Sequence, residues 1–348
     1  MKNRLSSVQW SVSALAVGLS FACGGSQTPP VEAPVQPVVE PAPAAEVAPA
    51  ADAKAVSGPI VIKDVGLATP ESVQYEPVSD VYLVSNINGD PLAKDDNGFI
   101  SKISPDGKVL ELKWIDGASA DVELNAPKGF GVSNGKLFVA DIDVIRTFDL
   151  ATGKPEKQIK VAGASFLNDV AVAPDGTVFV SDTGLKAGKE GLEPAKKDAI
   201  YKVSTDGKLS TLIKGESLGL PNGLSADADG VWVATWQGKL YRVTNAGKQE
   251  AAVTVPGQQL DGLLRTADGQ VIISSWEKSS VFIGTADGQF SPLVSDLKAP
   301  ADLGYDAQRN QILVPLFTEN AIEIHKVPQL VAKAAPATAP ANATAGAK

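Results

Sequence analysis

The sequence predicts an all-β fold, a six-bladed β-propeller whose ring is closed by an N-terminal strand that completes the last blade. Three observations support this prediction. A segment with a polar start, short apolar strands and an Asp-Gly turn, best seen at 221–243, recurs along the chain to give six copies. The copies lie about 40 residues apart, which is the period of propeller blades with four strands each. The last copy lacks one strand, and one spare strand precedes the first copy.

Each repeat opens on a small or apolar residue that is followed by a polar one. Short apolar runs and tight turns follow, and this alternation is typical of antiparallel meanders. The composition, with Gly 32 and Pro 24, also favours many strands joined by many turns. The six openings are Pro70–Tyr75, Pro127–Phe130, Leu167–Val172, Pro221–Leu224, Leu260–Leu263 and Ala301–Tyr305.

Ring closure is predicted from the two ends of the repeat region. Only an Ala- and Pro-rich tail follows Val327, so the sixth repeat has no fourth strand of its own. The apolar segment Ile60–Val65 lies before the first repeat and has no other partner. We expect it to pair with the last repeat, because a closed ring has no open sheet edge that would favour aggregation.

The flanks of the repeat region predict export. Residues 1–22 carry Lys2 and Arg4 before an apolar run, which is the pattern of a signal peptide. Cys23 follows directly and predicts a bacterial lipid-attachment site, with ordinary cleavage after Ala22 as the alternative. We expect a Pro- and Ala-rich tether over 23–57, the propeller over 58–327 and a disordered tail over 328–348. The predicted location is the periplasm or the outer membrane, with the lipid as the only membrane contact.

The charge and cysteine content exclude several partners. The formal net charge is −9, from 31 basic and 40 acidic residues, which argues against nucleic acid and anionic membrane surfaces. The one cysteine lies outside the predicted propeller, which therefore has no disulfide and no thiol nucleophile. We expect a monomer that acts on a small molecule.

Two repeats are longer than the others. The additional residues lie at 87–97 and 183–198, between the second and third strands of the first and third repeats. Loops of this length in a compact ring are either functional or tolerated insertions. The sequence leaves both alternatives open.

The polar openings are the candidate functional residues. The first strand of each propeller blade lines the central channel, so the side chains that open these strands converge around one axis. Glu, Asn and Asp offer oxygen ligands, which suit Ca²⁺, Mg²⁺ or Mn²⁺ better than Zn²⁺ or copper. The converging residues are Glu71, Lys128, Asn168, Asn222, Asp261 and Asp302.

These openings resemble those of the senescence marker protein, gluconolactonase and luciferin-regenerating enzyme family. The resemblance rests on Pro70-Glu71, Leu167-Asn168-Asp169, Pro221-Asn222-Gly223-Leu224 and Leu260-Asp261-Gly262. It implies a six-bladed propeller that hydrolyses a small-molecule lactone or ester with one divalent cation, Ca²⁺ before Mg²⁺, Mn²⁺ or Zn²⁺. The implied metal ligands are Glu71, Asn222 and Asp261, the implied substrate contact is Asn168, and Asp261 is also the implied general base.

Three positions differ from the family pattern. Phe166 stands where the animal lactonases have an arginine that contacts the sugar, and Ser72 stands where the first repeat usually has glycine. Lys128 adds a positive charge near the implied metal, where it would bind an anionic substrate group or pair with Asp302. A sugar lactone is therefore not predicted as the substrate.

An alternative function is a non-catalytic propeller that binds a protein or glycan partner, with the polar openings serving only to solvate a wet channel. Other motifs favour structural roles. The Gly131–Gly135 stretch matches an esterase pattern but lies in a strand-to-strand turn, and the only histidine is His325. Asp227–Gly230 is interpreted as a hairpin turn rather than a calcium loop. Trp236 and Trp276 are interpreted as blade packing, with the floor of a ligand pocket as the alternative.

Overall fold

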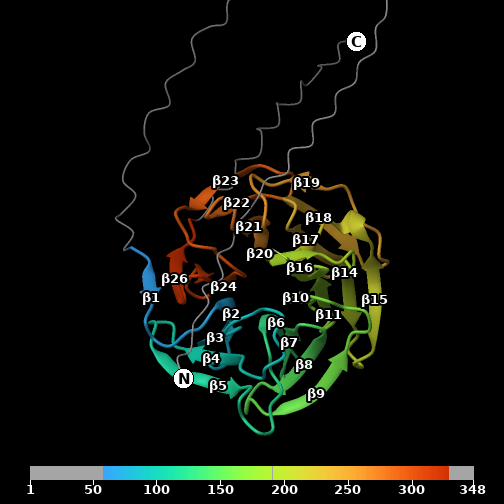
Figure 1. Cartoon of the computed structure of the whole chain (residues 1–348). Helices are drawn as coiled ribbons and strands as arrows, with labels where there is room; N and C mark the ends of the chain where they lie inside the picture. The colour runs from blue at the N-terminus through green and yellow to red at the C-terminus, as the bar shows by residue number, and fades with distance from the viewer. Residues whose placement is uncertain (1–57, 190, 329–348) are drawn as a thin grey trace, which may run out of the picture. The chain divides into compact units, whose positions relative to one another are not determined.

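The computed structural model describes residues 58–189 and 191–328, which form six four-stranded antiparallel sheets around a central axis (Figure 1). The prediction of an all-β six-bladed propeller is confirmed. No helix within the described residues is long and apolar enough to cross a membrane. Cys23, the predicted signal segment, the tether and the tail from residue 329 lie outside the described residues.

The first three blades each run from the axis outwards in chain order. The first contains β2 (Pro70–Glu76), β3 (Val81–Asn86), β4 (Phe99–Ile103) and β5 (Val109–Asp116). The second contains β6 (Pro127–Ser133), β7 (Lys136–Asp141), β8 (Val144–Asp149) and β9 (Pro155–Lys160). The third contains β10 (Leu167–Val172), β11 (Val178–Asp182), β14 (Ala199–Val203) and β15 (Leu209–Lys214).

The fourth and fifth blades repeat this order, after a short 3-10 helix η1 (Glu216–Leu218). The fourth contains β16 (Pro221–Asp227), β17 (Gly230–Thr235), β18 (Lys239–Thr244) and β19 (Val253–Thr254). The fifth contains β20 (Leu260–Arg265), β21 (Gln270–Ser275), β22 (Ser280–Thr285) and β23 (Phe290–Val294).

The sixth blade closes the ring as predicted. It contains β24 (Gly304–Asp306), β25 (Gln311–Leu316) and β26 (Ala321–Lys326), and its outer strand is β1 (Ile60–Ile62) from the other end of the chain. Figure 1 shows blue β1 beside red β26, and the register pairs Ile60 with Ile324. The strand is shorter than the predicted Ile60–Val65, because Asp64 adopts a left-handed conformation with φ 58°.

The hydrophobic core lies between neighbouring blades. Side chains alternate between the two faces of a strand, so each sheet presents apolar residues to the blade before it and the blade after it. One such cluster joins Ile145 of β8 to Val170 of β10 and Val180 of β11, all buried. Burying a Val or Ile side chain stabilises a fold by about 1.5–3 kcal/mol. The blades are therefore held in place mainly by their neighbours.

The two long connections differ in structure. Residues 87–97 form an irregular loop between β3 and β4, whereas the connection at 183–198 contains the two-stranded sheet of β12 (Leu185–Gly188) and β13 (Gly191–Pro194). Both follow second strands, whose ends pair with the starts of the channel-lining strands, as Asn86 pairs with Pro70. The connections therefore lie at the end of the channel where the polar openings are.

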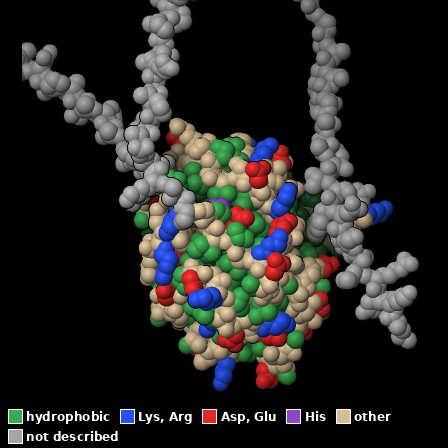
Figure 2. Space-filling model, turned by 90° about the vertical axis from the view of Figure 1, so that its left-hand side faces the viewer, with side chains coloured by type: hydrophobic (Ala, Val, Ile, Leu, Met, Phe, Trp, Pro, Cys, Tyr) green, Lys and Arg blue, Asp and Glu red, His purple; other side chains and the backbone are tan. Residues whose placement is uncertain are grey.

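The outer surface carries charges of both signs. Figure 2 shows Lys and Arg side chains interspersed with Asp and Glu on one side of the propeller, with no large area of a single sign.

Candidate functional site

The predicted site residues lie at β-bulges. In each of the first five blades, the pairing between the innermost strand and the second strand is interrupted by a register shift. The opening polar residue lies within this shift. A bulge inserts extra residues opposite the partner strand and changes the direction of their side chains. Each shift spans one predicted residue, and these are Glu71, Lys128, Asn168, Asn222 and Asp261.

Serine hydroxyls of the second strands support three of the bulges. A bulge leaves a backbone N–H without its ladder partner, and a buried N–H needs an acceptor. A hydroxyl at the same place in each second strand accepts that hydrogen bond. The pairs are Ser72 N to Ser85 Oγ at 2.9 Å, Asp169 N to Ser181 Oγ at 2.9 Å and Gly262 N to Ser274 Oγ at 2.8 Å.

Glycines let the channel-lining strands approach one another. A Cβ atom on Gly223 would lie 2.0 Å from the carbonyl oxygen of Asp261, and one on Gly262 would lie 2.3 Å from the backbone nitrogen of Leu303. Neither separation is possible for a real side chain. The glycine after Asn222 is therefore what brings β16 against β20 and places Asn222 beside Asp261.

Asn222 and Asp261 are joined directly. The Asn222 Nδ2 atom donates to Asp261 Oδ1 at 3.1 Å and to the carbonyl oxygen of Leu260 at 3.1 Å. The indole Nε1 of Trp276 donates to the other oxygen of Asp261, Oδ2, at 2.8 Å. Both oxygens of this carboxylate are thus held by donors, and the second lone pair of each remains for a further partner.

Two of the predicted metal ligands carry a buried oxygen without a hydrogen-bond partner. These atoms are Glu71 Oε2 and Asn222 Oδ1. Leaving a buried acceptor unsatisfied costs about 1–3 kcal/mol, and more when the group is charged. A cation bound between them would remove this cost. The chemistry of the donors thus fits a divalent cation held by oxygen.

The carboxyl groups at this end of the channel destabilise each other's charged forms. Burial, followed by the charges of Asp261 and Asp302, raises the pKa of Glu71 well above its usual value. Burial raises the pKa of Asp261 to about 7 and that of Asp169 to about 6. Burial and the charge of Asp169 raise the pKa of Asp302. A bound cation would compensate these charges and lower all four pKa values.

The set depends on the amide of Asn222. Within the described residues no group of three His, Cys, Asp or Glu side chains is arranged to hold a metal ion. The predicted set supplies only two carboxylates, those of Glu71 and Asp261, and takes its third oxygen from the asparagine. Amide and carboxylate oxygens are ligands that Ca²⁺ accepts, usually together with water.

Lys128 is buried beside this set but does not form the predicted alternative pair with Asp302. Its Nζ atom donates to the carbonyl oxygens of Pro91 at 3.1 Å and Ala126 at 3.2 Å, and lies 4.5 Å from the ring centroid of Phe166. Asp302 instead accepts a short hydrogen bond from Ser72. Burial lowers the pKa of Lys128 to about 8. It has one donor left for a ligand.

Asn168 is tied to the neighbouring blade. Its Nδ2 atom donates to the Thr183 hydroxyl at 3.0 Å, and this hydroxyl donates to the carbonyl oxygen of Pro221 at 2.8 Å. Asn168 is therefore fixed next to the strand that carries Asn222. One N–H of its amide has a partner in the protein, which leaves the second N–H and the oxygen for a substrate.

The structure adds residues to the site that the sequence did not assign. Trp276, predicted to pack in the blade with the floor of a ligand pocket as the alternative, donates to Asp261, and Thr183 connects Asn168 to β16. Asp169 raises the pKa values of Glu71, Asp261 and Asp302 through its charge. In the sequence, only the position of Trp276 at the end of a second strand indicated a place in the site, because such ends lie beside the polar openings.

The motifs interpreted as structural are so in the structure. The Ser133 hydroxyl donates to the carbonyl oxygen of Gly176 at 2.9 Å, at the far end of β6, and His325 pairs with Glu323. The esterase-like pattern therefore has no histidine partner. Asp227 accepts from Arg242 at 2.7 Å and from Arg265 at 3.2 Å, which makes it part of an ion-pair cluster at a hairpin.

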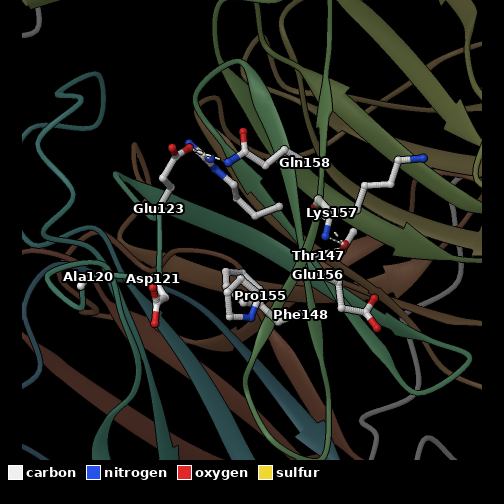
Figure 3. Close-up of a pocket in the computed structure, with 10 residues that line it drawn as sticks. Ala120, Asp121, Glu123, Thr147, Phe148, Pro155, Glu156, Lys157 and Gln158 are labelled. Carbon is white, nitrogen blue, oxygen red and sulfur yellow. Dashed lines mark hydrogen bonds and ion pairs between the residues drawn. The ribbon is translucent and has the colours of Figure 1, made fainter.

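Two cavities lie away from the predicted set. A cleft of about 210 Å³ lies at the outer part of the second blade, where Glu123 binds Arg146 and Gln158. Figure 3 shows the side chains of Glu123 and Gln158 in this cleft. A cavity of about 320 Å³ lies among the channel-lining strands, and its lining includes residues at their far ends, such as Tyr75, together with Asp169 and Asp302. Neither is lined by Glu71, Asn222 or Asp261.

Comparison with protein families decides the assignment. The model of the SMP-30/gluconolactonase/LRE-like region matches residues 103–300, which is more than half of the chain. The chain belongs to this family. The resemblance predicted from the polar openings is thus confirmed, and the match includes Lys128, Asn168, Asn222 and Asp261.

Three solved structures with the same fold are the following. A gluconolactonase from Xanthomonas campestris has a TM-score of 0.60 at 18% identity and covers 78% of this chain and 95% of its own. Luciferin-regenerating enzyme has a TM-score of 0.58 at 13% identity, covering 78% and 96%. A calcium-binding regucalcin from Agrobacterium tumefaciens has a TM-score of 0.55 at 17% identity, covering 78% and 94%. At these identities the similarity shows the fold. No curated protein matched the sequence.

Proposed function

We propose that this propeller binds one divalent cation at the polar end of its channel and hydrolyses a lactone or ester there. The observation that carries the proposal is the pair of unsatisfied buried oxygens, Glu71 Oε2 and Asn222 Oδ1, on two of the three predicted ligands. Family membership supports the activity, since the family includes gluconolactonases.

The chain's own residues have distinct roles in this proposal. Glu71, Asn222 and Asp261 hold the cation, which supplies a positive charge that polarises the carbonyl group of the substrate. Asp261 accepts the proton of the attacking water, and the hydrogen bonds from Asn222 and Trp276 fix its orientation. Lys128 uses its remaining donor to bind negative charge on the substrate or product.

Calcium is the proposed cation. The three residues offer only oxygen, and Ca²⁺ prefers six to eight oxygen ligands in a flexible arrangement, so water would complete the set. A calcium-binding regucalcin shares the fold. Mg²⁺, Mn²⁺ or Zn²⁺ would be accepted less well, the last because it favours nitrogen and sulfur.

The test is turnover of a panel of lactones and esters by the chelator-treated protein with and without added Ca²⁺. We expect hydrolysis only with the cation, and its loss in Glu71→Gln. Glu123→Gln, which changes a carboxylate in the outer cleft of Figure 3, is the matched control and should keep full activity. Raised melting temperature with Ca²⁺ but no turnover on any member would favour the alternative, a non-catalytic binding propeller. No effect of Ca²⁺ on either measurement would contradict the metal site.

We also propose that the mature protein is a lipid-anchored monomer in the periplasm or on the outer membrane. The support is the junction of the apolar run 11–22 with Cys23, and the acidic composition. Expression with labelled fatty acid should label the full chain and place it in the membrane fraction. Cys23→Ser should remove the label and release the protein; a labelled Cys23→Ser protein would contradict the anchor.

A further inference from the structure

Three aromatic side chains form a contiguous group beside the predicted metal ligand Asp261. Trp276 donates to Asp261, its ring centroid lies 5.9 Å from that of Trp236, and it lies 5.0 Å from that of Phe317. The three residues follow the second strands of the fourth, fifth and sixth blades. All three remain partly exposed in the folded chain.

The apolar surface around these aromatics also includes residues from the long connections of the first and third blades. Leu92, in the loop 87–97, packs against one buried cluster that includes Ile142 and another that includes Phe166. Phe317 packs against the first of these clusters and Trp236 against the second. We call the half-buried residues of this surface the apolar rim, and they are Leu92, Leu192, Trp236, Trp276 and Phe317.

The polar groups beside the rim are largely occupied by the protein itself. Two of the three N–H donors of Lys128 bind backbone carbonyl oxygens. The amide nitrogens of Asn168 and Asn222 also donate to groups of the protein. Each oxygen of Asp261 accepts one hydrogen bond. A ligand with many hydroxyl groups needs a partner for each hydroxyl that it buries, and few free donors are offered here.

We propose that the site takes a lactone or ester with an apolar group, an alkyl chain or an aromatic ring, that packs on the apolar rim. Contact with such a group removes apolar surface of the partly exposed aromatic side chains from water, which favours binding. The same side chains cannot form the hydrogen bonds that a sugar hydroxyl makes with water. Phe166, where the animal lactonases carry arginine, agrees with this selectivity. The inference rests on the proposed function because it places the reacting carbonyl at Glu71, Asn222 and Asp261.

The first test measures chain-length dependence with the Ca²⁺-loaded full chain. Five-membered lactones with alkyl chains of increasing length are compared with gluconolactone for kcat/KM. The corresponding alkyl lactams, which resist hydrolysis, are compared for Kd through tryptophan fluorescence. We expect kcat/KM to rise and Kd to fall by about fourfold for each CH₂ group that becomes fully buried, and gluconolactone to be the poorer substrate.

Variants locate the effect. Trp236→Ala and Phe317→Ala should each flatten the dependence of lactam Kd on chain length. Trp232→Ala is the matched control, because Trp232 is an equally half-buried tryptophan of the same blade that faces Arg265 at the far end of the sheet. It should keep the dependence, and the melting temperature of each variant shows that it is folded.

The outcomes separate this inference from the proposed function. Calcium-dependent hydrolysis with gluconolactone preferred, or with no dependence on chain length, would overturn the apolar selectivity while leaving the hydrolase. Lactam binding that tightens with chain length, without turnover of any lactone, would support the rim as a binding surface while the hydrolase fails. A dependence that Trp232→Ala abolishes and Trp236→Ala keeps would place the apolar site elsewhere and overturn the inference.

Discussion

The acidic residues at the two ends of the blades have opposite electrostatics. In the outer hairpin turns, Asp106, Asp206 and Asp287 are exposed and accept hydrogen bonds from their own turns, and these hydrogen bonds lower their pKa values. At the polar end of the channel, Glu71 and Asp261 are buried, and burial raises their pKa values. The fold thus stabilises the charged form of the carboxyl group in the turns and destabilises it in the channel.

The difference follows from what surrounds each group. A turn aspartate finds its partner two residues away, such as Ser204 for Asp206, so the local sequence alone provides it. A channel aspartate meets side chains from other blades, and Asp261 interacts with Asn222 39 residues away. The turn acids stabilise the fold, which is reason enough for their presence. Buried carboxylates that repel each other destabilise it, so their presence points to a bound cation or another function.

The largest expected effect is on turnover, when Asp261 is replaced by asparagine. Asp261→Asn keeps the shape but removes the negative charge and the proton acceptor, and general base catalysis typically contributes 10²–10⁴-fold. We expect kcat for the preferred lactone to fall by about this factor. Asp206→Asn, at a turn, should retain the wild-type kcat. Equal losses in the two variants, or none in Asp261→Asn, would contradict the comparison.

The fold could be predicted from the sequence because its signals are local and repeated. Asp-Gly turns and polar openings recur at each blade, and closure follows from the unpaired segment near Ile60. Where local backbone overrides the pattern, the prediction fails in detail, as Asp64 ends β1 early. The hairpin of β12 and β13 lies in a connection whose composition gave no clear strand pattern.

The candidate site could be predicted only in part. The residues that open the channel strands were identified because topology alone brings them together. Their bulges, and the hydroxyls that support them, leave no distinctive residue pattern, since Ser85, Ser181 and Ser274 appear as ordinary strand residues. The bond from Trp276 to Asp261 and the position of Lys128 over Phe166 depend on side-chain directions, which the sequence does not specify.

The next effect concerns stability and compares a channel glycine with a turn glycine. In Gly223→Ala the new Cβ would meet the Asp261 carbonyl oxygen, so β16 and β20 must separate. We expect about 3 kcal/mol or more of destabilisation. Gly269→Ala has space around it but a φ of 86°, and should cost only about 1 kcal/mol. Urea unfolding of both variants measures this; equal losses would show that the strands do not approach so closely.

The pH dependence of stability should have opposite signs for the two sets of acids. Folding raises the pKa of Asp261 to about 7 and of Asp169 to about 6, from about 3.9 in the unfolded chain. The folded state then binds more protons than the unfolded chain at these two groups. Their contribution to the free energy of unfolding is therefore fully present below about pH 4 and is lost as pH rises to about 7. Turn acids such as Asp206, whose pKa is lowered, lose their contribution only as pH falls below about 4.

In chelator, the melting temperature should therefore decrease between pH 5 and pH 7.5. Added Ca²⁺ should offset this decrease, because the cation binds the ionised carboxylates of the folded state. Asp261→Asn should make the slope in chelator shallower, and Asp206→Asn should not change it over this range. A slope that Asp261→Asn leaves intact would assign the effect to other groups.

The smallest effect isolates the orientation of Asp261. Trp276→Phe retains a ring near Trp236 and Phe317 but removes the Nε1 donor to Asp261. Groups that orient a metal ligand typically contribute 10–100-fold to metal affinity, and we expect the lower end, because Asn222 still holds the other oxygen. Calorimetric Ca²⁺ titration should thus show a Kd about tenfold higher. Trp232→Phe loses an equivalent bond to the hairpin residue Asp227 and should leave the Kd unchanged. Equal Kd values for both variants would mean that the hydrogen bond from Trp276 to Asp261 contributes to fold stability and not to metal binding, as the hydrogen bonds of the turn acids do.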